Sequence, residues 1–276
     1  MICILDFINW DVEPQIFKGF NLGYYNLLFV FGIVICAIII KRIFESENIS
    51  ETVFTKLFYY CMFGIIIGAR LGHCLFYEPE YYLIHPMEMI FPFTFENGKF
   101  IFTGYRGLAS HGGVIGMLCA IFLFSRNTGL NYLKTLDYIA IVAPLGSSFI
   151  RIGNLMNSEI IGKATNVSWA FVFHRVDSTP RHPAQLYEAI AYLIMFVIMW
   201  VLFKKKGMIS LQRGFYFGLV LFMIFTFRFF IEFLKERQVS FESGMFIDMG
   251  QILSIPLILI GLFYTFRKNK HLLTNK

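Results

Sequence analysis

Eight ionisable side chains lie inside long apolar stretches of this 276-residue chain, where charge is costly and usually serves a function. They are Arg70, His73, His111, Asp137, Arg151, Glu188, Arg228 and Glu232. Histidine can exchange a proton near neutrality, and the planar fork of arginine matches a pair of phosphate oxygens. These residue types predict a site for an anionic headgroup. The structural alternative is that each charge is neutralised locally, as Arg228 and Glu232 could be at i,i+4 spacing.

The stretch "GLASHGGVIG" places His111 directly before Gly112 and Gly113. Glycine in an apolar helix lets another backbone or a ligand approach closely. Two interpretations therefore stay open. The histidine is a reactive group that something bulky must approach, or it is a hydrogen-bonded residue at the start of a helix.

The elements that carry these residues are predicted to be transmembrane helices. The chain is 57% apolar and only 15% charged, with a mean hydropathy of +0.63, whereas soluble domains are about a quarter charged. We expect an all-α integral membrane protein that forms a single membrane domain over residues 1–276. Seven transmembrane helices are predicted at about 22–40, 57–77, 108–125, 135–153, 184–203, 214–234 and 250–266.

Two long joints between these spans have their own character. Residues 154–183 are predicted to form a small extracytoplasmic head inserted between spans, with a short strand in "SWAFVFHRV". Residues 78–107 are aromatic and interrupted by proline, which suits an interfacial segment in the headgroup layer. The N-terminus carries Asp11 and Glu13 rather than a basic stub, so no cleavable signal peptide is expected.

The distribution of Lys and Arg predicts the orientation. Short joints on one side hold 13 basic residues and those on the other side hold 5, so the N-terminus is expected outside and the C-terminus in the cytoplasm. The net charge of +6 lies mostly in these joints, which favours anionic lipid surfaces and no nucleic acid. Only Asp137 then falls near the cytoplasmic face. The other ionisable residues converge on the outer leaflet, which predicts a phospholipid ligand.

Six motifs in order resemble those of the prolipoprotein diacylglyceryl transferase family over residues 14 to 260. They are "GARLGHCLFY", "SHGGVIG", "RIGNLMNSEIIG", "RHPAQLYE", "FRFFIEFLKE" and "MGQILSIP". The resemblance implies a seven-span enzyme of the bacterial cytoplasmic membrane, active at the outer leaflet. Its implied substrates are phosphatidylglycerol and the lipobox cysteine of a prolipoprotein signal peptide. The implied products are a thioether-linked diacylglyceryl group and glycerol 1-phosphate.

The resemblance also assigns residues. It places Tyr25, His111, Arg151 and Arg228 as catalytic candidates. Its substrate-binding candidates are Arg151, Asn154, Glu159, Gly162 and Glu232. The convergence of charged residues and glycines adds Arg70, Gly112, Gly113, His182 and Glu188 as further substrate-binding candidates. Some members carry a tyrosine four residues before the arginine of the fifth motif, where this chain has Ile224.

The chemistry of thioether formation indicates which of these residues would act on the thiol and which would bind the phosphate. A thiol reacts as thiolate, so His111 is the candidate base, or it orients the headgroup. The charge of the leaving phosphate must be held in a low-dielectric site, which suits Arg151 and Arg228. No metal or other cofactor is expected. One rival class is a transporter, which would place charges near the midplane of the bilayer and have broken spans in two related halves. The other is a non-catalytic phospholipid-binding membrane protein.

Overall fold

The computed structural model describes residues 7–17, 22–91, 93–96, 99–102, 107–208, 211–237 and 246–267. The chain divides into two compact units. One, called here the bundle unit, combines Met1–Ile40 with Leu136–Lys276, and the other, the hairpin unit, is Lys41–Thr135. Two helices, α1 (Tyr24–Ser46) and α6 (Tyr132–Met156), run across the boundaries between the units.

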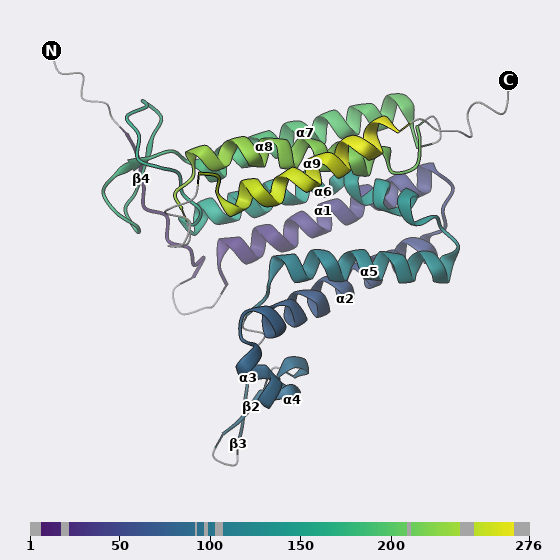
Figure 1. The fold of residues 1–276 in the computed structure, drawn as a ribbon, viewed down its shortest axis with the longest axis horizontal. Coiled ribbons are helices and arrows are strands. Elements are labelled where there is room, and N and C mark those ends of the chain that lie inside the picture. The colour runs from purple at the N-terminus through teal and green to yellow at the C-terminus, as the bar shows by residue number, and fades with distance from the viewer. Residues whose placement is uncertain are drawn as a thin grey trace. The chain divides into compact units, whose positions relative to one another are not determined.

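The bundle unit is built from long apolar helices (Figure 1), and small residues allow them to approach closely. Besides most of α1 and α6, it contains α7 (Ala184–Lys206), α8 (Phe215–Ile231), the short 3-10 helix η1 (Glu232–Leu234) and α9 (Met249–Phe266). A Cβ added at Gly32 of α1 would lie 3.0 Å from the Cβ of Phe149 on α6, and one at Gly218 of α8 would lie 2.6 Å from that of Tyr264 on α9. Glycine therefore sets the close approach of both helix pairs.

Asp137 has a structural partner at the start of α8. Its carboxylate accepts hydrogen bonds from the backbone N–H of Gly214 at 2.6 Å and of Phe217 at 2.9 Å. The first N–H groups of a helix have no partner within the helix, and a carboxylate placed there satisfies them. The one ionisable residue expected near the cytoplasmic face therefore caps a transmembrane helix.

A three-stranded sheet with the order β1-β4-β5 lies at one end of the bundle unit. Strand β1 (Ile8–Trp10) pairs in parallel with β4 (Phe171–Phe173), with Ile8 opposite Phe171, and β4 pairs antiparallel with β5 (Pro180–Arg181). A small core of Leu155, Phe171 and Phe173 lies beneath the sheet, with Trp10 packed against it. The strand predicted in "SWAFVFHRV" is thus observed, whereas its partner from the N-terminal segment had no signal of its own.

The hairpin unit consists of α2 (Glu51–Phe76), which packs against α5 (Ser110–Thr128), and a small appendage (Figure 1). In the chain, the appendage follows α2 and precedes α5. The appendage contains α3 (Pro79–Ile84), α4 (Pro86–Ile90) and the antiparallel hairpin of β2 (Phe93–Glu96) and β3 (Lys99–Phe102). It falls in the joint 78–107, of which residues 92, 97–98 and 103–106 lie outside the described residues. Its exposed side chains include Ile84, Met87 and Ile90.

Glycines form the interface between α2 and α5. Gly64, Gly68 and Gly72 recur every four residues on α2, and Gly112, Gly116 and Ala120 do the same on α5. A Cβ at Gly72 would lie 2.7 Å from the Cα of Gly112, and one at Gly68 the same distance from the Cα of Gly116. This is the small-xxx-small packing typical of membrane helices.

Six helices in the described part of the chain are long and apolar enough to cross a membrane: α1, α2, α6, α7, α8 extended through Leu234, and α9. They coincide with six of the seven predicted spans and fit a mostly helical, multi-pass membrane protein. The remaining predicted span, 108–125, is the helix α5. Its apolar stretch is short because polar residues stand at both ends, Ser110 and His111 at one and Arg126 and Asn127 at the other.

Candidate functional site

Arg151 lies in the last turns of α6, and its guanidinium is held by two other side chains. Its Nε lies 3.0 Å from Oε2 of Glu188, which is completely buried on α7, and its Nη1 donates to Oδ1 of Asn154 at 3.1 Å. A buried charge is tolerated only when it is paired and hydrogen-bonded. Arg151 therefore has a fixed orientation, set by one carboxylate and one amide.

The end of α6 folds back so that Glu159 meets the same cluster. Asn154 and Asn157 donate from their Nδ2 atoms to the two carboxylate oxygens of Glu159, each at 3.1 Å. The backbone makes this turn through left-handed residues at Ser158 (φ 55°) and Ile160 (φ 57°). The buried Gln185 donates to the carbonyl of Glu159 at 2.5 Å. The "RIGNLMNSEIIG" motif thus contains the end of α6 and the hydrogen-bonded turn that follows it.

Gly162 is positioned where no side chain fits. Its N–H donates to the carbonyl of His182 at 2.9 Å, and a Cβ added to it would lie 2.5 Å from that oxygen and 2.9 Å from the carbonyl oxygen of Leu234. Three segments of backbone therefore meet at this glycine: the motif after α6, the segment before α7, and η1 after α8. A larger residue would force them apart.

His182 bonds within the protein as well. Its Nδ1 lies 3.2 Å from the hydroxyl of Tyr187, which also accepts a 2.8 Å hydrogen bond from Nε1 of Trp169. Partial burial lowers the pKa of His182. Nearby, Arg181 forms an ion pair with Asp177 at 2.6 Å and lowers the pKa of that carboxyl. These contacts stabilise the segment that carries β4 and β5.

A second arginine, Arg228, lies near the end of α8 beside a buried group of charges. Its Nε is 3.6 Å from Oε1 of Glu232, so the i,i+4 pair expected from the sequence forms. The Nζ of Lys235 lies 3.4 Å from the same oxygen and 3.1 Å from Oε1 of Glu188. Tyr192 also donates to Oε1 of Glu188, at 3.3 Å. The two arginines therefore belong to one connected set of ion pairs.

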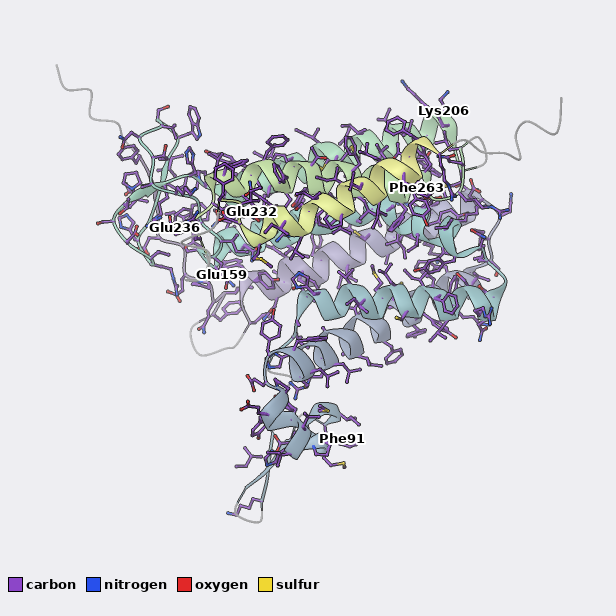
Figure 2. The ribbon with its side chains drawn as sticks, viewed as in Figure 1. Phe91, Glu159, Lys206, Glu232, Glu236 and Phe263 are labelled. Atoms are coloured by element: carbon purple, nitrogen blue, oxygen red, sulfur yellow. The ribbon has the colours of Figure 1, made fainter. Side chains whose placement is uncertain are left out.

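Tyr25, at the start of α1, packs on the glycine two residues after Arg151. A Cβ at Gly153 would lie 2.8 Å from Cδ2 of the tyrosine ring. The bundle unit thus brings together the predicted site residues Tyr25, Arg151, Asn154, Glu159, Gly162, His182, Glu188, Arg228 and Glu232. Glu159, Glu232 and Glu236 lie at the end of the bundle next to β4, while Lys206 lies at the opposite end (Figure 2).

The other four predicted site residues belong to the hairpin unit. His111 is exposed in the first turn of α5. Arg70 is buried and donates to the carbonyls of Glu88 at 2.6 Å and Met89 at 3.2 Å, and its guanidinium stacks on Tyr82 at 4.8 Å. In this structure Arg70 therefore ties α4 to α2.

Gly112 and Gly113 differ in what they approach. Gly112 lies against the backbone of Gly68 and Gly72, so of the two partners expected for it, a backbone or a ligand, the observed one is a backbone. Gly113 is looser, because a Cβ added there would lie 3.5 Å from that of Ala69, which is ordinary contact.

Two residues of the cluster were missed by the sequence analysis. Lys235 stands three residues after Glu232, and Gln185 lies within "RHPAQLYE". Both are polar residues at the edge of apolar stretches, which was the available signal. Among the described residues, no group of three or more His, Cys, Asp or Glu side chains is placed to hold a metal ion.

Comparison with known proteins places these features in a family. The family model for prolipoprotein diacylglyceryl transferase matches residues 14–267. A protein of Bacteroides fragilis named phosphatidylglycerol–prolipoprotein diacylglyceryl transferase is 55% identical over 262 residues, covering 94% of both chains. Proteins of the same name from Chloroherpeton thalassium and Porphyromonas gingivalis are 42% and 38% identical, and each alignment covers at least 95% of both chains. The chain belongs to the prolipoprotein diacylglyceryl transferase family.

Proposed function

We propose that this chain transfers the diacylglyceryl group of phosphatidylglycerol to the thiol of the lipobox cysteine in a prolipoprotein signal peptide. The cysteine sulfur forms a bond to the glyceryl carbon, the bond from that carbon to the phosphate oxygen breaks, and glycerol 1-phosphate leaves. The observation that carries the proposal is the connected ion-pair set that holds both Arg151 and Arg228. Relatives named for this activity cover nearly the whole chain.

In this proposal the two arginines bind the phosphate. The phosphodiester carries one negative charge, and the phosphate gains a second as the bond to carbon breaks. Preoriented donors stabilise such developing charge most where water is excluded. Glu188 and Asn154 orient Arg151, and Glu232 orients Arg228. Glu159 holds Asn154 in place, and Tyr25 and Gly162 position the turn that presents Arg151.

His111 has two roles open to it in the reaction. It either removes the proton from the thiol, which reacts as thiolate, or it donates a hydrogen bond to the lipid headgroup. Its exposure in the first turn of α5 supports access to a substrate in either case. His182 acts through its backbone carbonyl, which accepts a hydrogen bond from the N–H of Gly162.

We further propose seven spans with the N-terminus outside and the site at the outer leaflet of a bacterial inner membrane. Strands β1 and β4 are hydrogen-bonded and must lie on the same side, so the chain between them crosses an even number of times. Helices α1, α2 and α6 supply three crossings, and α5, packed along α2, supplies the fourth. Residues 154–183, with β4 and β5, form the extracytoplasmic head of this single membrane domain.

The test is a transfer assay with the purified full chain in liposomes. Phosphatidylglycerol labelled in its acyl chains is mixed with a lipobox peptide, and the control peptide has serine in place of the lipobox cysteine. We expect label on the cysteine peptide alone, together with free glycerol 1-phosphate.

Two other outcomes would contradict the proposal. Lipid binding without a covalent product would indicate the rival phospholipid-binding protein. Movement of labelled lipid between leaflets without any peptide product would indicate a transporter. Since both rivals leave the peptide unmodified, the mass of the peptide separates them from the proposed enzyme.

A further inference from the structure

Lys235 is a buried lysine that contacts two carboxylates at once. Its side chain is 5% exposed, and its Nζ lies 3.1 Å from Glu188 and 3.4 Å from Glu232. Lysine is rarely buried, because removing an ammonium group from water is costly unless it is paired and hydrogen-bonded. Two carboxylate partners satisfy this requirement for Lys235.

Each of those carboxylates also contacts one of the two arginines. Glu188 pairs with Arg151 and Glu232 pairs with Arg228. The five side chains therefore alternate in charge along one connected path, with Lys235 in the middle. Three cations and two carboxylates lie on this path, and Glu159 joins the same cluster through Asn154, which contacts both Arg151 and Glu159.

The backbone of Lys235 is fixed by the turn that follows Arg151. Lys235 forms an isolated β-bridge with Gly162. On either side of this bridge, the backbone N–H of Lys163 donates to the carbonyl of Leu234 at 2.8 Å, and the backbone N–H of Glu236 donates to the carbonyl of Ile161 at 3.1 Å. The position of the ammonium group is therefore set by the same turn as Asn154 and Glu159. The ends of α6, α7 and α8 are connected through this one residue.

We propose that Lys235 is a positioning residue that fixes the separation and direction of the Arg151 and Arg228 guanidinium groups through Glu188 and Glu232. This inference rests on the function proposed above. Lys235 does not touch the substrate. It keeps both carboxylates in place. Since the phosphate gains negative charge as its bond to carbon breaks, Lys235 affects turnover more than the affinity for phosphatidylglycerol.

The first test compares Lys235→Met, which removes the charge, with Lys235→Arg, which keeps it. Lys205→Met is the matched control, because Lys205 is exposed in the last turn of α7 and has no part in the cluster. We expect Lys235→Met to lower kcat roughly 10²-fold, the scale of a small misplacement of catalytic groups. Its KM for phosphatidylglycerol should change less than about threefold, since ground-state binding is largely kept. Lys235→Arg should stay within about fivefold of wild type in kcat, and Lys205→Met should match wild type.

A double variant separates positioning from folding. Because Lys235 acts on Arg151 through Glu188, the double variant Lys235→Met with Glu188→Gln should turn over no more slowly than the slower of the two single variants. If the two substitutions instead multiply their losses, or if Lys235→Met turns over like wild type, the inference is overturned. Equal loss in the Met and Arg variants would also overturn it, because charge would then be irrelevant. If Lys235→Met does not fold, Lys235→Gln with Glu188→Gln takes its place, and wild-type turnover in that neutral pair overturns the inference. A wild-type chain that modifies no peptide would refute the proposed function itself.

Discussion

Arg151 shows what sequence can and cannot indicate about a single side chain. Its position at the end of an apolar stretch, near Asn154 and Glu159, was enough to predict that these groups converge. The ion pair of Arg151 with Glu188 could not be predicted, because the two residues lie on different helices and Glu159 and Glu232 were also available as partners. Lys235 was missed for the same reason. Its importance depends on two partners, only one of which is near it in sequence.

The geometry of the Arg151 fork leads to a prediction about charge and shape. Arg151→Lys keeps the positive charge, but a compact ammonium cannot hold Glu188, Asn154 and a phosphate at once. We expect transfer activity to fall about 10²-fold, the scale for losing one preoriented donor. Arg175→Lys, an exposed change in the head, is the control. Near-normal turnover of Arg151→Lys, in protein that inserts normally, would mean that charge alone matters there.

His111→Gln distinguishes the two roles open to His111. Glutamine keeps a hydrogen-bond donor and acceptor but cannot take up a proton near neutrality. If His111 is the base, turnover falls about 10²–10⁴-fold and the residual rate rises with pH, as hydroxide generates thiolate. Binding of phosphatidylglycerol should persist. Turnover and lipid binding are measured from pH 6 to 9, and loss of binding with an unchanged pH profile would assign His111 to the headgroup instead.

At the scale of elements, glycine spacing determines how helices pair. The four-residue repeats on α2 and α5 were visible in the sequence, but glycine permits approach by a backbone or by a ligand, and sequence does not choose between them. The structure places Gly112 against Gly68 and Gly72. Arg70, near the end of α2, likewise donates to two main-chain carbonyls of α4. A pattern of side chains in the sequence does not predict bonds to main-chain carbonyls.

The α2–α5 interface predicts that substitutions at Gly113 and Gly116 differ in their effect on stability. A Cβ at Gly116 would meet the Cα of Gly68 at 2.7 Å, whereas one at Gly113 would make only ordinary contact. Gly116→Ala should therefore destabilise the chain by about 1–3 kcal/mol, the usual cost of overpacking, and Gly113→Ala by much less. Thermal unfolding of the two variants in the same detergent measures the difference. Equal midpoints would show that the helices can separate at no cost.

At the scale of the whole molecule, hydropathy predicted the long helices well because the bilayer imposes one length on all of them. The sheets were harder to predict. β5 has two residues, and β1 has three and pairs with a strand some 160 residues away, so neither gives a periodic signal. The helix α5 was predicted as a span from the apolar residues in 108–125, and its apolar stretch is short because polar residues stand at both ends.

Orientation gives a prediction that involves every span. We expect a cysteine at Ser178, which is exposed in the head, to react with an impermeant maleimide in intact cells. A cysteine at Lys206, at the opposite end of the bundle, should react only after the membrane is opened (Figure 2). The parent chain, with its own cysteines, sets the background. The reverse pattern would place the Arg151 cluster on the cytoplasmic side.

The parallel pairing of β1 with β4 imposes an order on biogenesis. Residues 8–10 leave the ribosome first, yet their hydrogen-bonding partners at 171–173 follow only after α1, α2, α5 and α6 have been made. Bringing the two ends of so long a loop together costs conformational entropy, and this cost is offset only when the sheet forms. In the proposed topology, residues 8–10 therefore cross the membrane early and stay unpaired until residues 171–173 follow. The last step of folding at this end is then the capture of the first strand that was synthesised.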